Sequence, residues 1–425
     1  MVLHPDPRKV LILGAGSGNG VAAALRHGAA EVVAVDIDPV IVAMGRAFHP
    51  ERPYDSPKAR VVIDGARSFL ATAEEKFDVI AYEFLDAHTM ATMTNARLDH
   101  YVYTRESFER ARELLAEGGL VVLRFGYERP FIADRLARTL REVFGQEPLA
   151  IGIAHRTEPL NGLVFVAGDL EAARRQVAGH ECLAAAVRAW EENPAFELPG
   201  TTRVATDDWP YLYLETADIP TLYYLMGAVL LVLFARSARE PGVRGRLRRW
   251  GRSQWHFFFL GAGFLLLEVQ NVSKAAVVLG STWQVTAVII SAVLALVLVA
   301  NLIAARLPNL PAAPVYALLC ASCLGLYFVD LSRFAFLPYA TKAAVVGGLV
   351  SLPVLFGGIA FVRSFAAAAR KDAALGANLF GSLVGGLLQS VTFITGIKAL
   401  LLIVAGLYLL AWATRPGAAV RDSSE

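Results

Sequence analysis

Residues 10–38 limit what this 425-residue chain can fold into more than any other stretch. An apolar run, Val10 to Leu13, leads into a turn rich in glycine, and a short helical stretch follows. A second apolar run then ends at Asp36 and Asp38. A strand, a glycine turn, a helix, a strand and an acid in this order are typical of a doubly wound α/β sheet that binds a nucleotide. The glycines of the turn are Gly14, Gly16, Gly18 and Gly20.

The order of these glycines narrows the ligand. Glycines let the backbone approach a ligand, and the acid at the end of the second strand can accept both hydroxyls of a ribose. A dinucleotide fingerprint requires G-x-G-x-x-G, but Asn19 or Val21 occupies its third glycine position in the two registers. The G-x-G-x-G that is present favours S-adenosylmethionine, or its decarboxylated form, over NAD.

An acid and a glycine follow the next predicted strand, Arg60 to Ile63. They are Asp64 and Gly65. At the end of a third strand such a pair is well placed to meet the adenine amine across the edge of the sheet. A plain turn is the alternative interpretation.

Two carboxylates and an imidazole follow the fourth predicted strand, Phe77 to Tyr82. They are Glu83, Asp86 and His88. The carboxyl end of a central strand faces the ligand crevice of a doubly wound sheet. There these groups can deprotonate an acceptor amine or hold a cation, so we predict that they are catalytic. The alternative is that Asp86 caps the next helix and His88 faces solvent.

The segment before the next predicted helix is a candidate acceptor pocket. We expect that helix to start near Arg105, with Thr104 as its N-cap, and to end at Glu117. The tyrosines of this segment either line the acceptor pocket or pack under the sheet. Later strands at residues 120–125 and 163–167 predict an α/β sheet of six or seven strands. The candidate pocket residues are Arg97, Asp99, Tyr101 and Tyr103.

Beyond about residue 215 the composition changes to apolar runs of roughly 17 to 25 residues, which are long enough to cross a bilayer. Seven arginines lie between the first two runs and should stay cytoplasmic, as should a domain that binds this cofactor. We therefore favour six spans, with the first run at the membrane interface or re-entering; seven spans is the alternative. The candidate spans are Pro220–Ala235, Trp255–Val272, Val285–Ala305, Ala312–Phe328, Ala340–Phe361, Leu375–Ile394 and Ile397–Trp412.

Several ordered motifs resemble the spermidine synthase (aminopropyltransferase) family over about residues 8 to 170. They are V-L-I-L-G-A-G-S-G-N-G, V-D-I-D-P, D-G-A-R-S-F-L, K-F-D-V-I, Y-V-Y-T-R-E-S-F and G-G-L-V-V-L. The resemblance implies that Gly14, Gly16 and Gly18 lie against the nucleoside. It also implies that Asp36 holds the ribose and Asp64 the adenine.

The reacting end departs from this family. Its members end the fourth strand with D-[ST]-x-D-P, in which the first Asp accepts the amine proton; here the same positions read Glu83-Phe84-Leu85-Asp86-Ala87. Glu83 has a longer side chain than the Asp of the family, so its carboxylate can still take a proton. Because that carboxylate is displaced, it can serve a different acceptor. The strings L-D-A-H-T, T-D-D-W-P and N-L-F-G-S-L-V-G-G are similar to a bacterial, membrane-fused subgroup.

We therefore predict three regions: a catalytic domain over residues 1–215, an interfacial segment with an Arg-rich cytoplasmic loop over 216–254, and an all-α transmembrane domain over 255–415. The protein would lie in the inner membrane with its catalytic domain in the cytoplasm, and no signal peptide is expected. It would move an aminopropyl or related group to an amine or a lipid-linked acceptor. The alternatives are a methyltransferase and a non-catalytic polyamine sensor or transporter.

Three further features bear on partners. No basic patch with interleaved aromatic residues is present, so we expect that the protein does not bind nucleic acid. We expect contacts with membrane lipids, and the sequence is compatible with a homodimer. Cys320 and Cys323 lie inside an apolar run, which favours small buried residues over a metal or redox pair. Glu268 is an acid within a strongly apolar run, where it either faces the bundle interior or pairs locally with Lys274.

Overall fold

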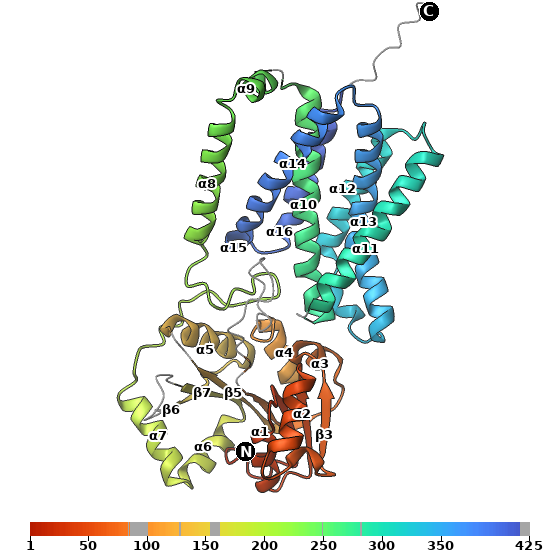
Figure 1. Cartoon of the computed structure of the whole chain (residues 1–425). Coiled ribbons are helices and arrows are strands. Elements are labelled where there is room, and N and C mark those ends of the chain that lie inside the picture. The colour runs from red at the N-terminus through yellow and green to blue at the C-terminus, as the bar shows by residue number, and fades with distance from the viewer. Residues whose placement is uncertain are drawn as a thin grey trace, which may run out of the picture. The chain divides into compact units, whose positions relative to one another are not determined.

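The structure, a computed structural model, divides the chain into two compact units, Met1–Thr216 and Ala217–Glu425. It describes residues 1–83, 85, 101–126, 129–153, 162–248, 250–280 and 283–416. The first unit contains strands and helices, whereas the second contains helices (Figure 1).

The first unit is built on a seven-stranded sheet in the order β3-β2-β1-β4-β5-β7-β6. The first five strands run parallel, and β7 is antiparallel to both of its neighbours. This mixed, Rossmann-like sheet confirms the predicted fold class. Its strands are β1 (Lys9–Leu13), β2 (Glu31–Asp36), β3 (Ala59–Ile63), β4 (Phe77–Tyr82), β5 (Leu115–Gly126), β6 (Leu149–Ile153) and β7 (Gly162–Gly168).

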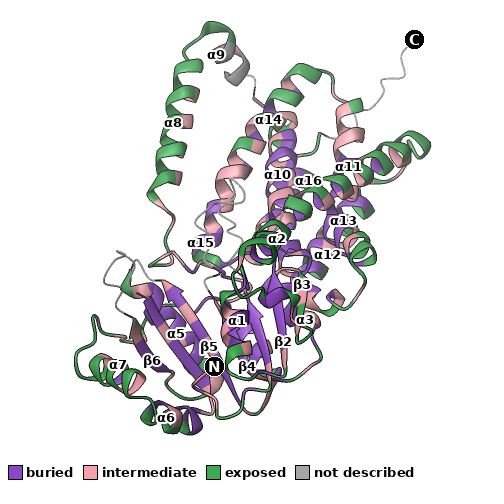
Figure 2. Ribbon diagram, turned by 60° about the horizontal axis from the view of Figure 1, so that its bottom comes forward, coloured by how far each residue is buried: buried purple, intermediate pink, exposed green. Residues whose placement is uncertain are grey.

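Helices cover both faces of this sheet, as expected for central strands that are continuously apolar. Alternate residues of β1 point to opposite faces: Leu11 packs in one core with α3, α4 and α5, and Ile12 packs in the other with α1. Figure 2 shows the strands as mostly buried. The helices are α1 (Asn19–Arg26), α2 (Pro39–Phe48), η1 (Pro53–Asp55), α3 (Ala66–Thr72), α4 (Arg105–Glu113), α5 (Pro130–Phe144), α6 (Leu170–Ala178) and α7 (Glu181–Glu192).

The predicted end of the helix at Glu117 is wrong, because α4 ends at Glu113. The following residues join β5 instead: Leu115 pairs with Phe77, and the register then shifts before Leu120 pairs with Val79. A glycine pair in a strand often marks such an irregularity, and here it does so inside the strand rather than at a helix end. Gly118 adopts the positive φ of 76° that this needs.

The second unit is a bundle of apolar helices. Four of its helices are long and apolar enough to cross a membrane by length and composition: α10, α11, α13 and the continuous run Lys371–Thr395. Three shorter apolar helices, α8, α12 and α16, coincide with the remaining predicted spans. The helices are α8 (Thr221–Ser237), α9 (Pro241–Arg248), α10 (Arg252–Leu279), α11 (Trp283–Arg306), α12 (Ala312–Phe328), η2 (Leu331–Phe334), α13 (Tyr339–Ala366), α14 (Lys371–Leu388), η3 (Gln389–Val391), α15 (Thr392–Thr395) and α16 (Ala399–Ala413).

Small residues bring α10 and α14 into close contact. A Cβ atom on Gly381 or Gly385 would collide with the carbonyl oxygens of Phe258 and Ala262 on α10. These two glycines thus form the close-packing face that their spacing predicts. Helix α8 differs, because none of its residues is buried (Figure 2).

The predicted local pairing of Glu268 with Lys274 is absent from the described residues. The Lys274 ammonium group donates instead to the backbone carbonyl of Leu326, at the end of α12. Cys320 and Cys323 are free thiols, and Cys323 is fully buried.

Candidate functional site

The glycine turn between β1 and α1 has a backbone that other residues adopt only with strain. Gly14, Gly16 and Gly18 have φ angles of 78°, 54° and 102°. Gly18 is also the N-cap of α1, so the turn ends where the backbone N–H groups of a helix begin. The predicted cofactor glycines therefore lie together at the carboxyl end of β1.

Asp36 ties this turn to the end of β2. One carboxylate oxygen accepts a hydrogen bond from the Gly16 N–H at 2.7 Å, and the other accepts from the Asp38 N–H at 2.9 Å. Asp36 is 9% exposed. Each carboxylate oxygen has a second acceptor position. The carboxylate can thus position the turn and still accept hydroxyl groups of a ribose.

Two further residues, Tyr54 and Gly45, support the glycine turn, and the sequence analysis did not identify them. The Tyr54 hydroxyl donates to the Gly16 carbonyl at 2.7 Å. Burial, with the charge of Asp36 nearby, raises the pKa of Tyr54 to about 12. Gly45 of α2 packs so closely that a Cβ atom there would lie 2.5 Å from the Ser17 carbonyl oxygen. Neither residue belongs to a spacing that predicts a ligand.

Asp64 lies beside Asp36, where the predicted adenine contact should be. Its N–H donates to the Asp36 carbonyl at 3.0 Å, and its carboxylate accepts from the Gly65 N–H at 2.7 Å. Ile37 directly follows β2 and is 39% exposed, and Ile63 is the last residue of β3 and is 48% exposed. Two exposed apolar side chains next to an acid suit a flat, apolar base with a polar edge.

Glu83 is the one predicted catalytic residue that the structure describes. Its N–H donates to the Leu13 carbonyl at 3.0 Å, and its carboxylate lies 3.6 Å from an Arg124 guanidinium nitrogen. A Cβ atom on Gly20 would lie 3.3 Å from this carboxylate, so Glu83 lies close to the start of α1. The other predicted site residues Asp86, His88, Arg97 and Asp99 lie outside the described residues.

The two tyrosines of the predicted acceptor pocket are buried. Tyr103 is fully buried and packs edge-on against Phe125 of β5, with ring centres 5.3 Å apart. Tyr101 is 3% exposed, and burial next to Tyr211 and two aspartates raises its pKa well above the usual value. Tyr103 thus packs in the core, while Tyr101 adjoins residues that come from much later in the chain.

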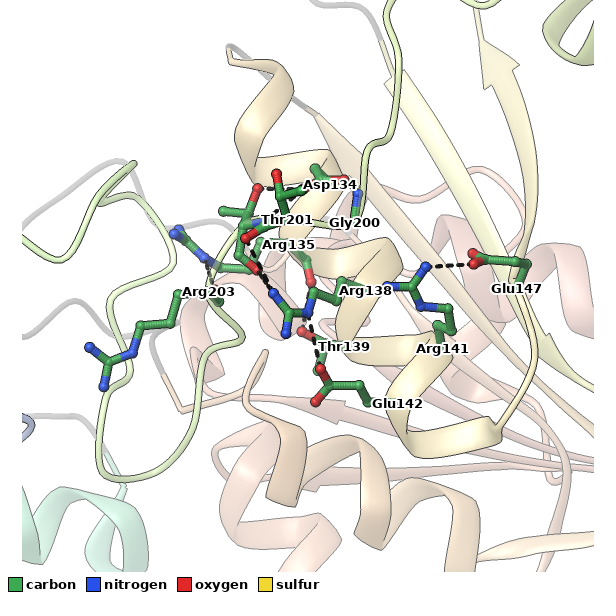
Figure 3. Close-up of polar contacts among 11 residues, drawn as sticks. Asp134, Arg135, Arg138, Thr139, Arg141, Glu142, Glu147, Gly200, Thr201 and Arg203 are labelled. Carbon is green, nitrogen blue, oxygen red and sulfur yellow. Dashed lines mark hydrogen bonds and ion pairs between the residues drawn. The ribbon is translucent and has the colours of Figure 1, made fainter.

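Those later residues belong to the linker segment, which we define as residues 200–216. The buried guanidinium of Arg135, on α5, donates to the backbone carbonyls of Arg203 at 2.6 Å and Leu214 at 2.7 Å. The neighbouring Asp134 accepts from the Gly200 N–H at 2.6 Å (Figure 3). Burial lowers the pKa of Arg135 to about 10, which leaves it charged at neutral pH. One arginine thereby fixes several turns of an otherwise irregular segment.

The linker segment also contacts the residues that follow Tyr101. The Arg105 N–H donates to the Ala205 carbonyl at 2.9 Å. The Thr104 hydroxyl donates to the Asp207 carboxylate at 2.7 Å, and Arg67 pairs with the same carboxylate at 2.8 Å. Thr104 thus stands at the predicted N-cap position of α4, but its side chain does not cap the helix. The T-D-D-W-P string includes Asp207, but nothing in it predicts this contact.

A further carboxylate, Glu106, lies in this contact. It accepts a hydrogen bond from the Asp207 N–H at 2.9 Å. Burial, together with the charge of Asp207, raises the pKa of Glu106. The linker segment therefore adds acidic groups to the side of the sheet where Tyr101 lies.

Residues 1–149 match the spermine/spermidine synthase domain. The first unit is a spermidine synthase-like domain. The polyamine aminopropyltransferase of Pyrobaculum calidifontis is 36% identical over 141 residues, which cover 32% of this chain and 47% of that protein. The Thermococcus onnurineus polyamine aminopropyltransferase is 28% identical over 176 residues, covering 40% of this chain and 60% of that protein.

The chain spans about half the length of the curated relatives it matches. Among solved structures, the Thermotoga maritima spermidine synthase aligns with a TM-score of 0.34 at 19% identity, covering 52% of this chain and 68% of that one. The spermidine synthase-like match ends before the linker segment.

Proposed function

We propose that the chain is a membrane-bound transferase that uses decarboxylated S-adenosylmethionine, or S-adenosylmethionine, and moves an aminopropyl or related group to an amine or a lipid-linked acceptor. The observation that carries this proposal is the hydrogen-bonded series from the Gly16 N–H through Asp36 to Asp64. It gathers a glycine turn, a ribose-type acceptor and an adenine-type acceptor at one edge of the sheet. Similarity to polyamine aminopropyltransferases supports the reaction type.

The described residues fit such a cofactor. Asp36 would accept hydrogen bonds from the ribose hydroxyls, and Asp64 would accept one from the adenine amine. Ile37 and Ile63 would contact the faces of the base. The sulfonium of the bound cofactor would supply an electrophilic carbon. The fold, for its part, provides a turn in which Gly14, Gly16 and Gly18 carry no side chain, next to which such a group can lie.

An acceptor amine must lose a proton before its nitrogen can attack. A carboxylate within hydrogen-bond reach is suited to take that proton. We propose Glu83 for this role, with Asp86 and His88 as the further candidates of the same segment. An Arg124 guanidinium nitrogen lies 3.6 Å from the Glu83 carboxylate and would help to keep it in place.

The acceptor would bind on the side of Tyr101, together with Arg97 and Asp99, whereas Tyr103 packs in the core. Its proposed second wall is the linker segment, with Tyr211 and Asp208 next to Tyr101. Aromatic rings and carboxylates together suit a cationic amine.

The second unit would anchor the transferase in the inner membrane. Its four long apolar helices and the three shorter ones support membrane insertion. The excess of arginine on the loops that join α8 to α10, α13 to α14 and on the end of α16 supports a cytoplasmic location for those loops. We propose six spans and a cytoplasmic catalytic domain, so that an acceptor at the membrane surface is within reach.

The test is mass spectrometry of the detergent-solubilised full chain after incubation with each form of the cofactor and a membrane extract. Methylthioadenosine as product would establish propyl-type transfer, and adenosylhomocysteine would establish methyl transfer. The mass gain identifies the acceptor. Cofactor binding without either product would refute the transferase and favour the sensor or transporter.

A further inference from the structure

A pocket opens in the second unit at the start of α12, the end of α13 and the second residue after α16. It does not belong to the spermidine synthase-like domain. Two of its lining residues are arginines, and none is a carboxylate. The lining residues are Ala312, Val315, Tyr316, Ile359, Ala360, Arg363, Ser364 and Arg415.

The two arginines give this pocket a net positive charge. Arg363 donates to the carbonyl of Pro308 at 2.9 Å and to that of Leu310, which fixes the loop between α11 and α12. Among the described residues, no carboxylate lies within 4.0 Å of the guanidinium of Arg363 or Arg415. The charge of Arg363 is thus held in place, and no carboxylate of the described residues pairs with it.

Tyr316, a residue with a buried hydroxyl group, also lines the pocket. Tyr316 is 4% exposed, and within the described part of the chain its hydroxyl has no hydrogen-bond partner. The hydroxyl of Tyr408, fully buried on α16, has none there either. Buried polar groups are nearly always hydrogen-bonded in native proteins, so a donor without a partner that lines a pocket indicates a ligand with acceptor atoms.

The wall of the pocket is rigid. The ring of His256, on α10, contacts the Ala411 carbonyl through Nδ1 at 2.7 Å and the Ser364 hydroxyl through Nε2 at 2.9 Å. Because a carbonyl oxygen only accepts, Nδ1 carries a hydrogen. His256 thus joins α10, α13 and α16 next to the pocket.

The pocket lies at the basic end of the bundle. Arg252 at the start of α10 donates to the Ala413 carbonyl at the end of α16 at 2.7 Å, so these two ends are adjacent. Arg306 precedes the loop that Arg363 holds. Basic pockets between membrane helices at such an end are suited to phosphate-bearing head groups.

We propose that this pocket binds a phosphate group, carried by an anionic lipid or by a free phosphate compound, through Arg363, Arg415 and the Tyr316 hydroxyl. Guanidinium and hydroxyl donors around an apolar floor match a phosphate that is attached to a lipid tail or another apolar group. This site is independent of the proposed transferase activity.

The experiment uses the full chain in phosphatidylcholine nanodiscs, with phosphatidylglycerol added in one arm and inorganic phosphate in the other. Native mass spectrometry counts bound lipid, and thermal unfolding measures stabilisation. We expect Arg415→Gln to weaken binding about tenfold, as loss of a charge-assisted hydrogen bond implies. We expect Tyr316→Phe, which retains the ring, to weaken it about threefold. The matched control is Arg306→Gln, an exposed arginine at the same end and outside the pocket.

Stabilisation by phosphatidylglycerol that both variants reduce and the control retains would support a lipid head group. The same pattern with inorganic phosphate would support a free phosphate compound. Equal binding by wild type, Arg415→Gln and Tyr316→Phe would overturn the proposal. Absence of binding in both arms would overturn it as well.

Discussion

Two regions of the spermidine synthase-like domain form the proposed site in different ways. The cofactor edge, residues 14–64, is held by hydrogen bonds within consecutive strand–helix units, such as the one between Gly16 and Asp36. The linker segment is held by bonds between distant residues: 68 positions separate Arg135 from Arg203, and 140 separate Arg67 from Asp207.

This difference has a functional meaning. The cofactor edge lies within residues 1–149, which match the spermine/spermidine synthase domain, whereas the linker segment lies beyond them. The linker segment contacts the Tyr101 side, where the proposed acceptor would bind. If the proposal holds, changes in the linker segment would alter the choice of acceptor more than the binding of the cofactor.

The sharpest test of this comparison is Arg135→Met. It would leave the carbonyls of Arg203, Leu212 and Leu214 without their donor, so we expect a loss of about 3 kcal/mol or more in the stability of the linker segment. Limited proteolysis within residues 200–216 and the unfolding temperature measure this loss. Arg175→Met, which removes an exposed ion pair with Glu171 on α6, should have almost no effect.

Cofactor affinity in Arg135→Met decides whether the two regions are independent. We expect the affinity for methylthioadenosine, measured by calorimetry, to stay within about twofold of wild type, because Arg135 contacts no residue of the glycine turn. Loss of nucleoside binding in parallel with linker cleavage would show that the two regions form one unit.

Asp36→Asn tests the cofactor edge alone. An amide can accept one hydroxyl but loses the charge and one acceptor oxygen, so nucleoside binding should weaken by about 1.5–3 kcal/mol, or roughly tenfold or more. Calorimetry with methylthioadenosine measures it. Asp38→Asn is the matched control, because Asp38 accepts the Val40 N–H as the N-cap of α2 and points to no proposed ligand position. Equal losses in both variants would contradict the assignment of the ribose to Asp36.

Gly18→Ala tests whether the glycines serve the backbone or only fill a turn. The φ angle of 102° disfavours alanine, and its Cβ atom would lie 2.7 Å from Pro53. We expect about 1–2 kcal/mol lower stability and weaker nucleoside binding, measured in the same titration. Gly28→Ala carries a similar φ of 86° with no atom within 4 Å, so it should lower stability while leaving binding unchanged.

The same contrast explains what the sequence could predict. Strands β1, β3 and β4 lie within one residue of their predicted positions, and β2 ends at the predicted Asp36, because apolar runs with glycine or acid boundaries act locally. The linker contacts could not be predicted, because no periodicity connects Arg135 to carbonyls far along the chain. Thr104 shows the conflict in one side chain. Its N-cap position is readable, but the distant Asp207 takes the hydroxyl that would have capped α4.

The smallest expected effect concerns Glu106, whose carboxylate is buried against Asp207. Burial and that neighbouring charge raise its pKa in the folded protein. The folded state therefore retains a proton that the unfolded state loses, so this group's contribution to stability is present below its ordinary pKa and declines as the pH rises through the raised value. Glu106→Gln retains an oxygen that can accept the Asp207 N–H and removes the charge.

We therefore expect Glu106→Gln to unfold at the same temperature as wild type at acidic pH. At neutral pH we expect it to unfold at a slightly higher temperature, with a gain of less than about 1 kcal/mol in the free energy of unfolding. Thermal unfolding of the full chain in detergent across this pH range measures the difference. Glu109→Gln, on the same helix with a side chain that is 47% exposed, should show no such trend. If neutral pH gives no gain, Glu106 is compensated by its surroundings. A gain in stability would mean that the Glu106 carboxylate destabilises the wild-type protein at neutral pH. An acid that lowers stability next to the proposed acceptor side is explained by function rather than by folding.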